Sequence, residues 1–274
     1  MKKNILFLTL IYSVLSSGCS FRGAPSGDAT ASQSSAKEGW VSLFNHRDLE
    51  GWTVKFKGYE LGENVNNTFR VVDGLLSVVY DDWSNFENGA FGHLFTNQSY
   101  SNYRIRLEYR FIGQQLTQDP KFAWAFRNNG VMLHSQSAAS MGLEQDFPIS
   151  AEAQLLGGNG TTQRPSGNLC SPGTHIVQGD ELLSQHCLQS NSATLHGDQW
   201  VKFEAEVRDD GSIKHFINGE LVFAYSELQV DPQDSWGKAW LEQGHPLTLR
   251  QGHIALQAET HPTQFRGIQI KALD

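Results

Sequence analysis

The sequence has little charge, little sulfur and few long apolar runs. Only 18% of its 274 residues are charged, and it holds three cysteines and three methionines. Its formal net charge is −8, which disfavours nucleic acid as a partner because phosphate binding needs basic surface. After the first 19 residues, no segment is apolar enough to cross a bilayer as a helix. We therefore expect neither a nucleic-acid role nor a membrane-spanning domain.

The familiar catalytic motifs are also missing. The chain has no Gly-x-Ser-x-Gly elbow, no glycine pattern for phosphate or dinucleotide binding, and no His-Glu-x-x-His metal motif. The usual signatures of serine hydrolases, nucleotide-binding enzymes and zinc proteases are therefore absent, and any chemistry must come from polar residues that interrupt strands.

Strand signals dominate the chain from residue 40 to residue 274, which we expect to be a single domain. Residues 103–111 alternate polar and apolar side chains, as do residues 201–207. Tight turns at residues 73–74, 209–211 and 218–219 predict a hairpin and a three-strand meander. The pattern predicts an all-β sandwich of two antiparallel sheets. Residues 114–121 and 227–247 are expected to be surface loops, and Trp52 and Trp200 core residues.

The first 39 residues are expected to lie outside this domain. Lys2 and Lys3 precede a short apolar run that ends at Gly18 and Cys19, a pattern typical of a bacterial lipoprotein signal over residues 1–19. Cleavage by the ordinary signal peptidase is the alternative, because Ser16 stands where such signals usually carry leucine. Residues 20–39 are rich in Ser, Ala and Gly, which predicts a flexible linker. We expect a lipid anchor on Cys19 and a place in the cell envelope, in the periplasm or at the outer membrane.

Two further cysteines, Cys170 and Cys187, are 17 residues apart. An exported chain meets oxidising conditions, so this pair predicts a disulfide. Two unpaired buried thiols are one alternative. Metal binding in the same loop through His175 or His186 is the other.

Residues 148–174 hold a polar strand followed by a glycine-rich turn. Glu152 and Gln154 point to the same side of this strand because side chains alternate faces. Gly157 and Gly158 follow and would let the backbone approach a ligand closely. A solvated outer face of an antiparallel sheet is the simpler interpretation, and a site is the other.

Other strands carry similar polar positions. His134 interrupts an apolar strand, and Gln257 and Glu259 share one strand face. A sheet face with amides, carboxylates and aromatic rings would suit a sugar. The remaining candidates for binding it are Lys214, Asn218, Arg110, Trp124 and Trp83.

Seven segments taken in order strengthen this interpretation. They are residues 41–52, 69–78, 91–111, 128–135, 148–174, 197–222 and 252–270. On these segments the chain resembles the 3-keto-disaccharide hydrolase family. The resemblance implies a concanavalin A-like jelly roll and a carbohydrate substrate.

The resemblance also implies a reaction. A 3-keto group makes the C2 proton of a sugar acidic, so a base can start elimination of the C1 substituent, and water can then add to the product. We expect this net hydrolysis, with Glu152, His134 or Glu259 as the base. No cofactor is established, although a divalent metal could polarise the ketone. A lectin-like binding module without turnover and a structural scaffold without a pocket are the alternatives.

Overall fold

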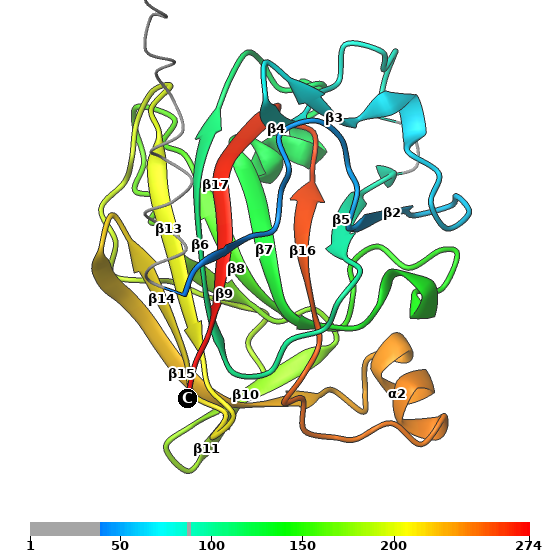
Figure 1. Cartoon of the computed structure of the whole chain (residues 1–274), viewed down its shortest axis with the longest axis vertical. Coiled ribbons are helices and arrows are strands. Elements are labelled where there is room, and N and C mark those ends of the chain that lie inside the picture. The colour runs from blue at the N-terminus through cyan, green and yellow to red at the C-terminus, as the bar shows by residue number, and fades with distance from the viewer. Residues whose placement is uncertain (1–38, 87–88) are drawn as a thin grey trace, which may run out of the picture.

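The computed structural model describes residues 39–86 and 89–274, which form a sandwich of two antiparallel sheets (Figure 1). This arrangement confirms the predicted fold class, a concanavalin-like β-sandwich. Cys19 and the expected signal and linker, apart from residue 39, lie outside the described residues. In the described part of the chain, no helix is long and apolar enough to span a membrane.

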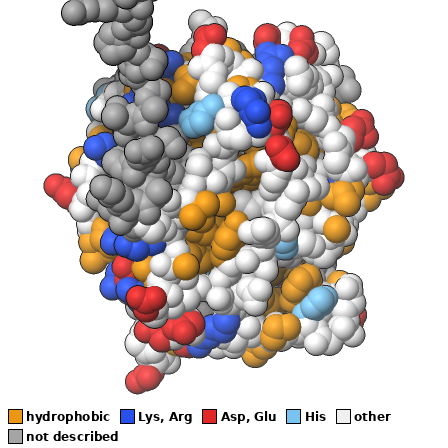
Figure 2. All heavy atoms as spheres, viewed as in Figure 1, with side chains coloured by type: hydrophobic (Ala, Val, Ile, Leu, Met, Phe, Trp, Pro, Cys, Tyr) orange, Lys and Arg blue, Asp and Glu red, His pale blue; other side chains and the backbone are white. Residues whose placement is uncertain are grey.

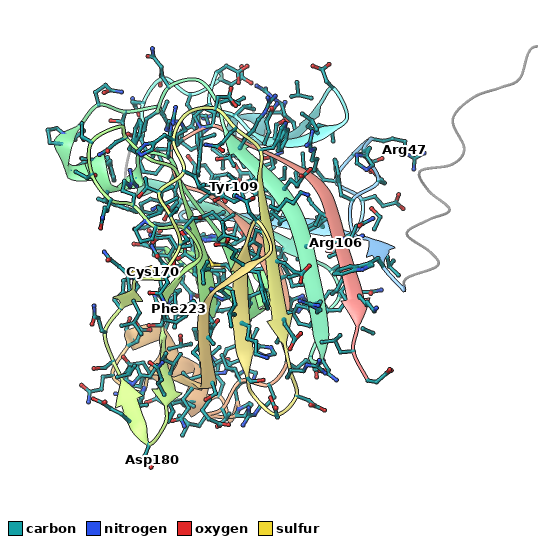
Figure 3. The ribbon with its side chains drawn as sticks, turned by 90° about the vertical axis from the view of Figure 1, so that its left-hand side faces the viewer. Arg47, Arg106, Tyr109, Cys170, Asp180 and Phe223 are labelled. Carbon is teal, nitrogen blue, oxygen red and sulfur yellow. A yellow bond between two sulfur atoms is a disulfide. The ribbon has the colours of Figure 1, made fainter. Side chains whose placement is uncertain are left out.

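The larger sheet has the strand order β11-β10-β15-β14-β13-β6-β17-β4-β3, and β1 also pairs with β17. Its strands are β1 (Val41–Ser42), β3 (Phe69–Val72), β4 (Leu75–Val78), β6 (Tyr103–Phe111), β10 (Thr174–Gln178), β11 (Glu181–Leu183), β13 (Val201–Val207), β14 (Ile213–Ile217), β15 (Glu220–Val230) and β17 (Thr263–Ala272). Figure 3 shows Asp180 at the tip of the β10–β11 hairpin, which projects at one end of the sandwich.

The smaller sheet has the order β12-β9-β8-β7-β16-β5-β2. Its strands are β2 (Trp52–Phe56), β5 (Gly92–Thr96), β7 (Asn128–Ser135), β8 (Ala151–Leu156), β9 (Asn168–Cys170), β12 (Cys187–Leu188) and β16 (His253–Ala258). Short helices lie in the connections: η1 (Val65–Asn67), η3 (Pro120–Ala125), η4 (Ala138–Ser140) and α2 (Ser235–Glu242).

Alternating side chains place the core between the sheets. In β6, every second residue from Tyr103 to Phe111 is buried and the residues between them are half-buried. The inward row of β6 packs against inward residues of the smaller sheet, such as Val131 and Leu256. Burying apolar side chains of this size contributes about 1.5–3 kcal/mol each, so the strand pattern is enough to fix which face looks inward.

Two predicted turns have the backbone that their residues favour. Asp73 and Gly74 have φ values of 51° and 75°, and Asn218 and Gly219 have values of 51° and 88°. Two consecutive left-handed residues make the turn whose twist matches a hairpin. These turns join β3 to β4 and β14 to β15, as the sequence predicted.

Two predictions about the larger sheet were wrong. Trp200 does not enter the core, because its ring lies under the guanidinium groups of Arg110 and Arg266 at 4.7 and 4.1 Å. Trp52, in contrast, is buried as predicted. The expected loop over residues 227–247 contains the end of β15 and the helix α2. That helix begins where the Asp234 side chain accepts hydrogen bonds from two backbone N–H groups.

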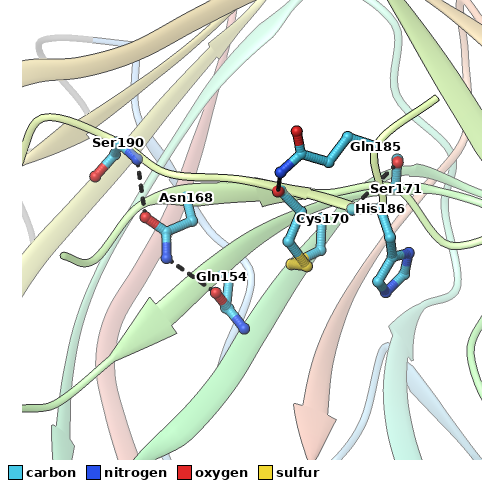
Figure 4. The surroundings of a disulfide bond; sticks show 8 residues. Gln154, Asn168, Cys170, Ser171, Gln185, His186 and Ser190 are labelled. Carbon is cyan, nitrogen blue, oxygen red and sulfur yellow. Dashed lines mark hydrogen bonds between the residues drawn. A yellow bond between two sulfur atoms is a disulfide. The ribbon is translucent and has the colours of Figure 1, made fainter. Parts of the chain in front are cut away.

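The predicted disulfide between Cys170 and Cys187 is present. The two cysteines are direct partners across β9 and β12 (Figure 4). Nε2 of His175 instead lies 2.8 Å from a carboxylate oxygen of Asp231. The disulfide thus ties the two-residue edge strand β12 to β9 of the smaller sheet.

Candidate active site on the outer face of the smaller sheet

The smaller sheet is covered on both faces. Ala151, Ala153 and Leu155 of β8 point into the main core, so Glu152 and Gln154 point to the outer face. Glu152 is nevertheless only 6% exposed. Side chains from β5, β7 and β16 pack with loop residues on this face; they are Phe95, Met132, Ala255, Ala138, Met141 and Phe147. The polar strand is therefore not a solvated sheet face.

Strand register brings polar residues of this outer face into one row. Lys55 is opposite His93, and His93 is opposite Gln257. On the other side of the row, Gly130 is opposite Gln154. Because Leu256 pairs with Val131, Gln257 and Gly130 are level with each other and complete the row.

Glu152 leans into this row through the gap at Gly130. A Cβ atom added to Gly130 would lie 2.4 Å from Oε1 of Glu152 and 2.7 Å from its Cγ. Real contacts of this kind stay beyond about 3 Å, so only glycine leaves room for the carboxyl group here. The carboxyl of Glu152 therefore lies over Gly130, whose neighbours in the row are Gln257 and Gln154.

A second buried carboxyl interacts with the first. Glu259 follows β16 on the same face as Gln257 and is 2% exposed. Burial raises the pKa of both carboxyls, and the negative charge of Glu152 raises the pKa of Glu259 further. Two buried carboxyls whose charges interact can supply one base and one acid.

His93 and Gln257 are the buried polar groups beside the carboxyls. Both are fully buried, and neither ring nitrogen of His93 nor either amide atom of Gln257 has a hydrogen-bond partner in the described structure. Burial lowers the pKa of His93 to about 3, so its ring is neutral and offers one donor and one acceptor. Buried polar atoms without a partner cost free energy. Such atoms are typical of a binding site whose ligand would supply the missing hydrogen bonds.

Sequence reasoning missed His93. Its strand is apolar apart from this residue and Thr96, so it lacks the run of polar positions that marks the strand of Glu152 and Gln154. Its position in the strand could have indicated its face. Leu94 points into the core, so His93 points to the outer face with Phe95. Only the pairing of β5 with β16 brings it opposite Gln257.

Gln154 is held by a chain of hydrogen bonds on the far side of the row. Asn168 donates its amide N–H to Oε1 of Gln154 at 2.9 Å, and the backbone N–H of Ser190 donates to Oδ1 of Asn168 at 2.9 Å (Figure 4). With its oxygen engaged, Gln154 keeps its amide N–H groups for other partners.

Aromatic side chains extend from the row toward solvent. The ring of Phe147 lies 5.8 Å from His93 and 5.0 Å from Phe91. Trp124, which is 48% exposed, lies 5.9 Å from Phe91. Trp83, the other tryptophan expected to stack on a sugar, packs against the core and donates its indole N–H to Thr68.

Three predicted binding residues belong to the larger sheet. Arg110 donates to Oε1 of Gln264, Lys214 lies 3.4 Å from Glu206, and the Asn218 side chain accepts from the backbone of Lys202. The structure therefore does not bring Arg110, Lys214 and Asn218 to the face that carries Glu152.

His134 is on the right strand but not in the row. Its φ of 50° is left-handed, and the β7–β16 register shifts beside it, so the alternation used to predict its direction fails here. The charge of Arg250 lowers the pKa of His134, whereas the charge of Glu152 raises the pKa of Glu259. His134 and Glu259 therefore have different charged neighbours. Within residues 39–86 and 89–274, no three His, Cys, Asp or Glu side chains lie close enough together to hold one metal ion.

A model of the 3-keto-alpha-glucoside-1,2-lyase-like domain matches residues 39–271. The chain belongs to this family. No curated protein sequence matches this family member.

The chain is similar to several solved structures, and the first of those that follow supports the sandwich fold. A provisionally assigned glycosyl hydrolase from Parabacteroides distasonis ATCC 8503 has 17% identity and a TM-score of 0.52, over 88% of this lyase-like chain and 97% of the other. A second from that organism has 16% identity and a TM-score of 0.46, over 85% and 99%. Carbohydrate-binding module CBM66 from Bacillus subtilis has 9% identity and a TM-score of 0.42, over 85% and 96%.

Proposed function

We propose that this protein cleaves 3-keto glycosides by elimination across C1 and C2, followed by addition of water. The observation that carries the proposal is the pair of buried carboxyls, Glu152 and Glu259, which are close enough for the charge of Glu152 to raise the pKa of Glu259. Membership of the 3-keto-alpha-glucoside-1,2-lyase-like family supports the substrate class. A binding site for neutral sugars would gain little from two buried carboxyls that hold protons.

The chemistry needs a base, an acid and a donor to the ketone. The base removes the proton from C2, and the C2–H electron pair forms an enolate with the C3 carbonyl. The enolate then re-forms the carbonyl, C1=C2 forms, and the C1–O bond breaks as the leaving oxygen takes a proton. Water adds its oxygen to C1 and a proton to C2, which gives the free 3-keto sugar and completes net hydrolysis.

The residues divide these roles by their place in the site. Glu152, whose carboxyl lies over Gly130 in the row, serves as the base at C2. Glu259, the second buried carboxyl, protonates the leaving oxygen. His93 and Gln257 can donate hydrogen bonds to the ketone oxygen, where negative charge develops, because the neutral imidazole and the amide each have a free N–H.

A lectin-like module is the second candidate, because unpartnered His93 and Gln257 could equally bind sugar hydroxyls. The two functions differ in turnover. A lectin would bind a 3-keto disaccharide and release no product, whereas the proposed enzyme would release a 3-keto sugar.

The decisive experiment is turnover of a 3-keto disaccharide in D₂O by the wild type, Glu152→Gln and Glu259→Gln. We expect solvent deuterium at C2 of the released sugar, above an enzyme-free control, and a loss of about 10²–10⁴-fold in rate for each variant. The exposed Glu220, on β15 of the larger sheet, supplies the matched control Glu220→Gln. Product without deuterium at C2 would contradict elimination, and full activity in a folded Glu152→Gln protein would remove Glu152 from the chemistry.

A further inference from the structure

A cavity of about 620 Å³ lies near the end of β7, beside the segment that follows α2. Its walls include His134, Trp240, His245 and Arg250. None of the four residues proposed for catalysis lines it. Hydrophobic side chains and a histidine gather where Figure 1 places α2 (Figure 2). The volume falls in the range of small-molecule sites.

His134 is held in this wall in a costly conformation. It is 1% exposed, both ring nitrogens lack a partner, and its φ is 50°. Gly252 leaves room for this arrangement, because a Cβ there would lie 2.3 Å from the carbonyl carbon of His134. Strained backbone and an unpaired buried side chain persist where the surrounding structure enforces them, and both are common at binding sites.

Arg250 in the wall is paired with Glu227, which does not line the cavity. Arg250 donates through Nη2 to both carboxylate oxygens of Glu227 at 2.7 Å. Burial and the charge of Arg250 lower the pKa of His134 to about 4, so its ring is neutral at physiological pH. Because Glu227 already neutralises Arg250, the cavity carries little net charge to attract a phosphate or a carboxylate.

The remaining wall is aromatic and apolar. Trp240 stacks on His245 with ring centroids 3.7 Å apart, and the indole nitrogen of Trp240 has no partner. Ile149 and Leu249 add aliphatic surface. A ligand that matches this wall must present C–H surface together with groups that both donate and accept hydrogen bonds.

We propose that this cavity is a second, non-catalytic binding site for a neutral saccharide ring. Sugar hydroxyls both donate and accept, so they can pair with the neutral imidazole of His134 and with the indole N–H of Trp240. The C–H faces of the ring suit the aromatic and aliphatic wall. The site goes beyond the proposed function, because it needs no turnover and no keto group.

The test is calorimetric titration with methyl α-glucoside and with maltose, neither of which carries a 3-keto group. The proteins are the wild type, Glu152→Gln, His134→Asn and Trp240→Ala, each checked by thermal melt. Asparagine tolerates a left-handed φ, so His134→Asn removes the ring and keeps the backbone. Trp236→Ala is the matched control, because Trp236 lies on the same helix and does not line the cavity.

We expect millimolar binding to the wild type and to Glu152→Gln, a loss of about tenfold or more in His134→Asn and Trp240→Ala, and no loss in Trp236→Ala. If one cavity variant fails to fold, the other decides the result. Unchanged binding in the folded cavity variants, or no binding of either sugar to the wild type, overturns the proposal. Preferential binding of inorganic phosphate that is lost in these variants also overturns it. Because Glu152→Gln should still bind, failure of the catalytic proposal would leave this result intact.

Discussion

Replacing Gly130 with alanine should force the carboxyl of Glu152 out of the polar row. The new Cβ would lie 2.4 Å from Oε1, 2.7 Å from Cγ and 2.8 Å from Cδ of Glu152. Since Cγ is close to the backbone, rotating the end of the side chain does not relieve the contact. Gly130 does not have a positive φ, so alanine meets no backbone strain of its own.

The magnitude follows from two opposing effects. Overpacking a buried site costs about 1–3 kcal/mol. Replacing glycine at a compatible position stabilises by about 0.4–1 kcal/mol, because the unfolded chain loses freedom. We therefore expect Gly130→Ala to lower the free energy of unfolding by about 1–2 kcal/mol. A misplaced catalytic group of this kind should cost on the order of 10²-fold in rate.

A double-mutant cycle isolates the contact. Urea unfolding would be measured for the wild type, Gly130→Ala, Glu152→Ala and the double variant. In the Glu152→Ala background the steric conflict is gone, so Gly130→Ala should be neutral or stabilising, with a coupling of about 1–3 kcal/mol between the sites. An equal penalty in both backgrounds, or a Gly130→Ala protein with wild-type stability and activity, would show that Glu152 does not lie over Gly130.

Three further predictions concern the carboxyl, the disulfide and the anchor. The pKa of the Glu152 carboxyl is raised in the folded protein. The protonated carboxyl therefore contributes its full stabilisation below the unfolded-state pKa of about 4.3, and this stabilisation is lost as pH rises toward the folded-state pKa. The melting temperature of Glu152→Gln should therefore exceed that of the wild type by an amount that grows from acid to neutral pH, and a constant difference would contradict this. Replacing both Cys170 and Cys187 with serine should cost about 3 kcal/mol, measured by equilibrium unfolding, and an unchanged midpoint would refute it. Cys19→Ala should release the protein from the membrane fraction of cells, whereas unaltered fractionation would reject the lipid anchor.

The sequence predicted strands and turns well because each is specified locally. Alternation in β6 reports which side chains face the core, and the Asn218-Gly219 pair specifies its turn. Alternation cannot report which sheet a strand joins. Arg110 and Lys214 were therefore grouped with Glu152, although their strands lie in the larger sheet.

The parts of the site that were missed depend on long-range pairing. His93 and Gln257 are 164 positions apart (257 − 93) and meet only through the β5–β16 register. The direction of the His134 side chain does not follow from strand alternation, because one left-handed residue breaks the period of two. Trp200 was placed in the core from its apolar character, but two arginines cover it on the outer face.

The disulfide between β9 and β12 affects whether neighbouring copies of the domain can pair through this edge of the smaller sheet. Strand β12 is only two residues long and lies at an edge of the smaller sheet. An edge strand can recruit a strand from a neighbouring molecule when its free backbone groups form a long, flat row. A two-residue strand fastened to its partner offers few such groups and cannot peel away to uncover β9. Many copies of this domain could then stand side by side on a surface without joining their sheets at that edge.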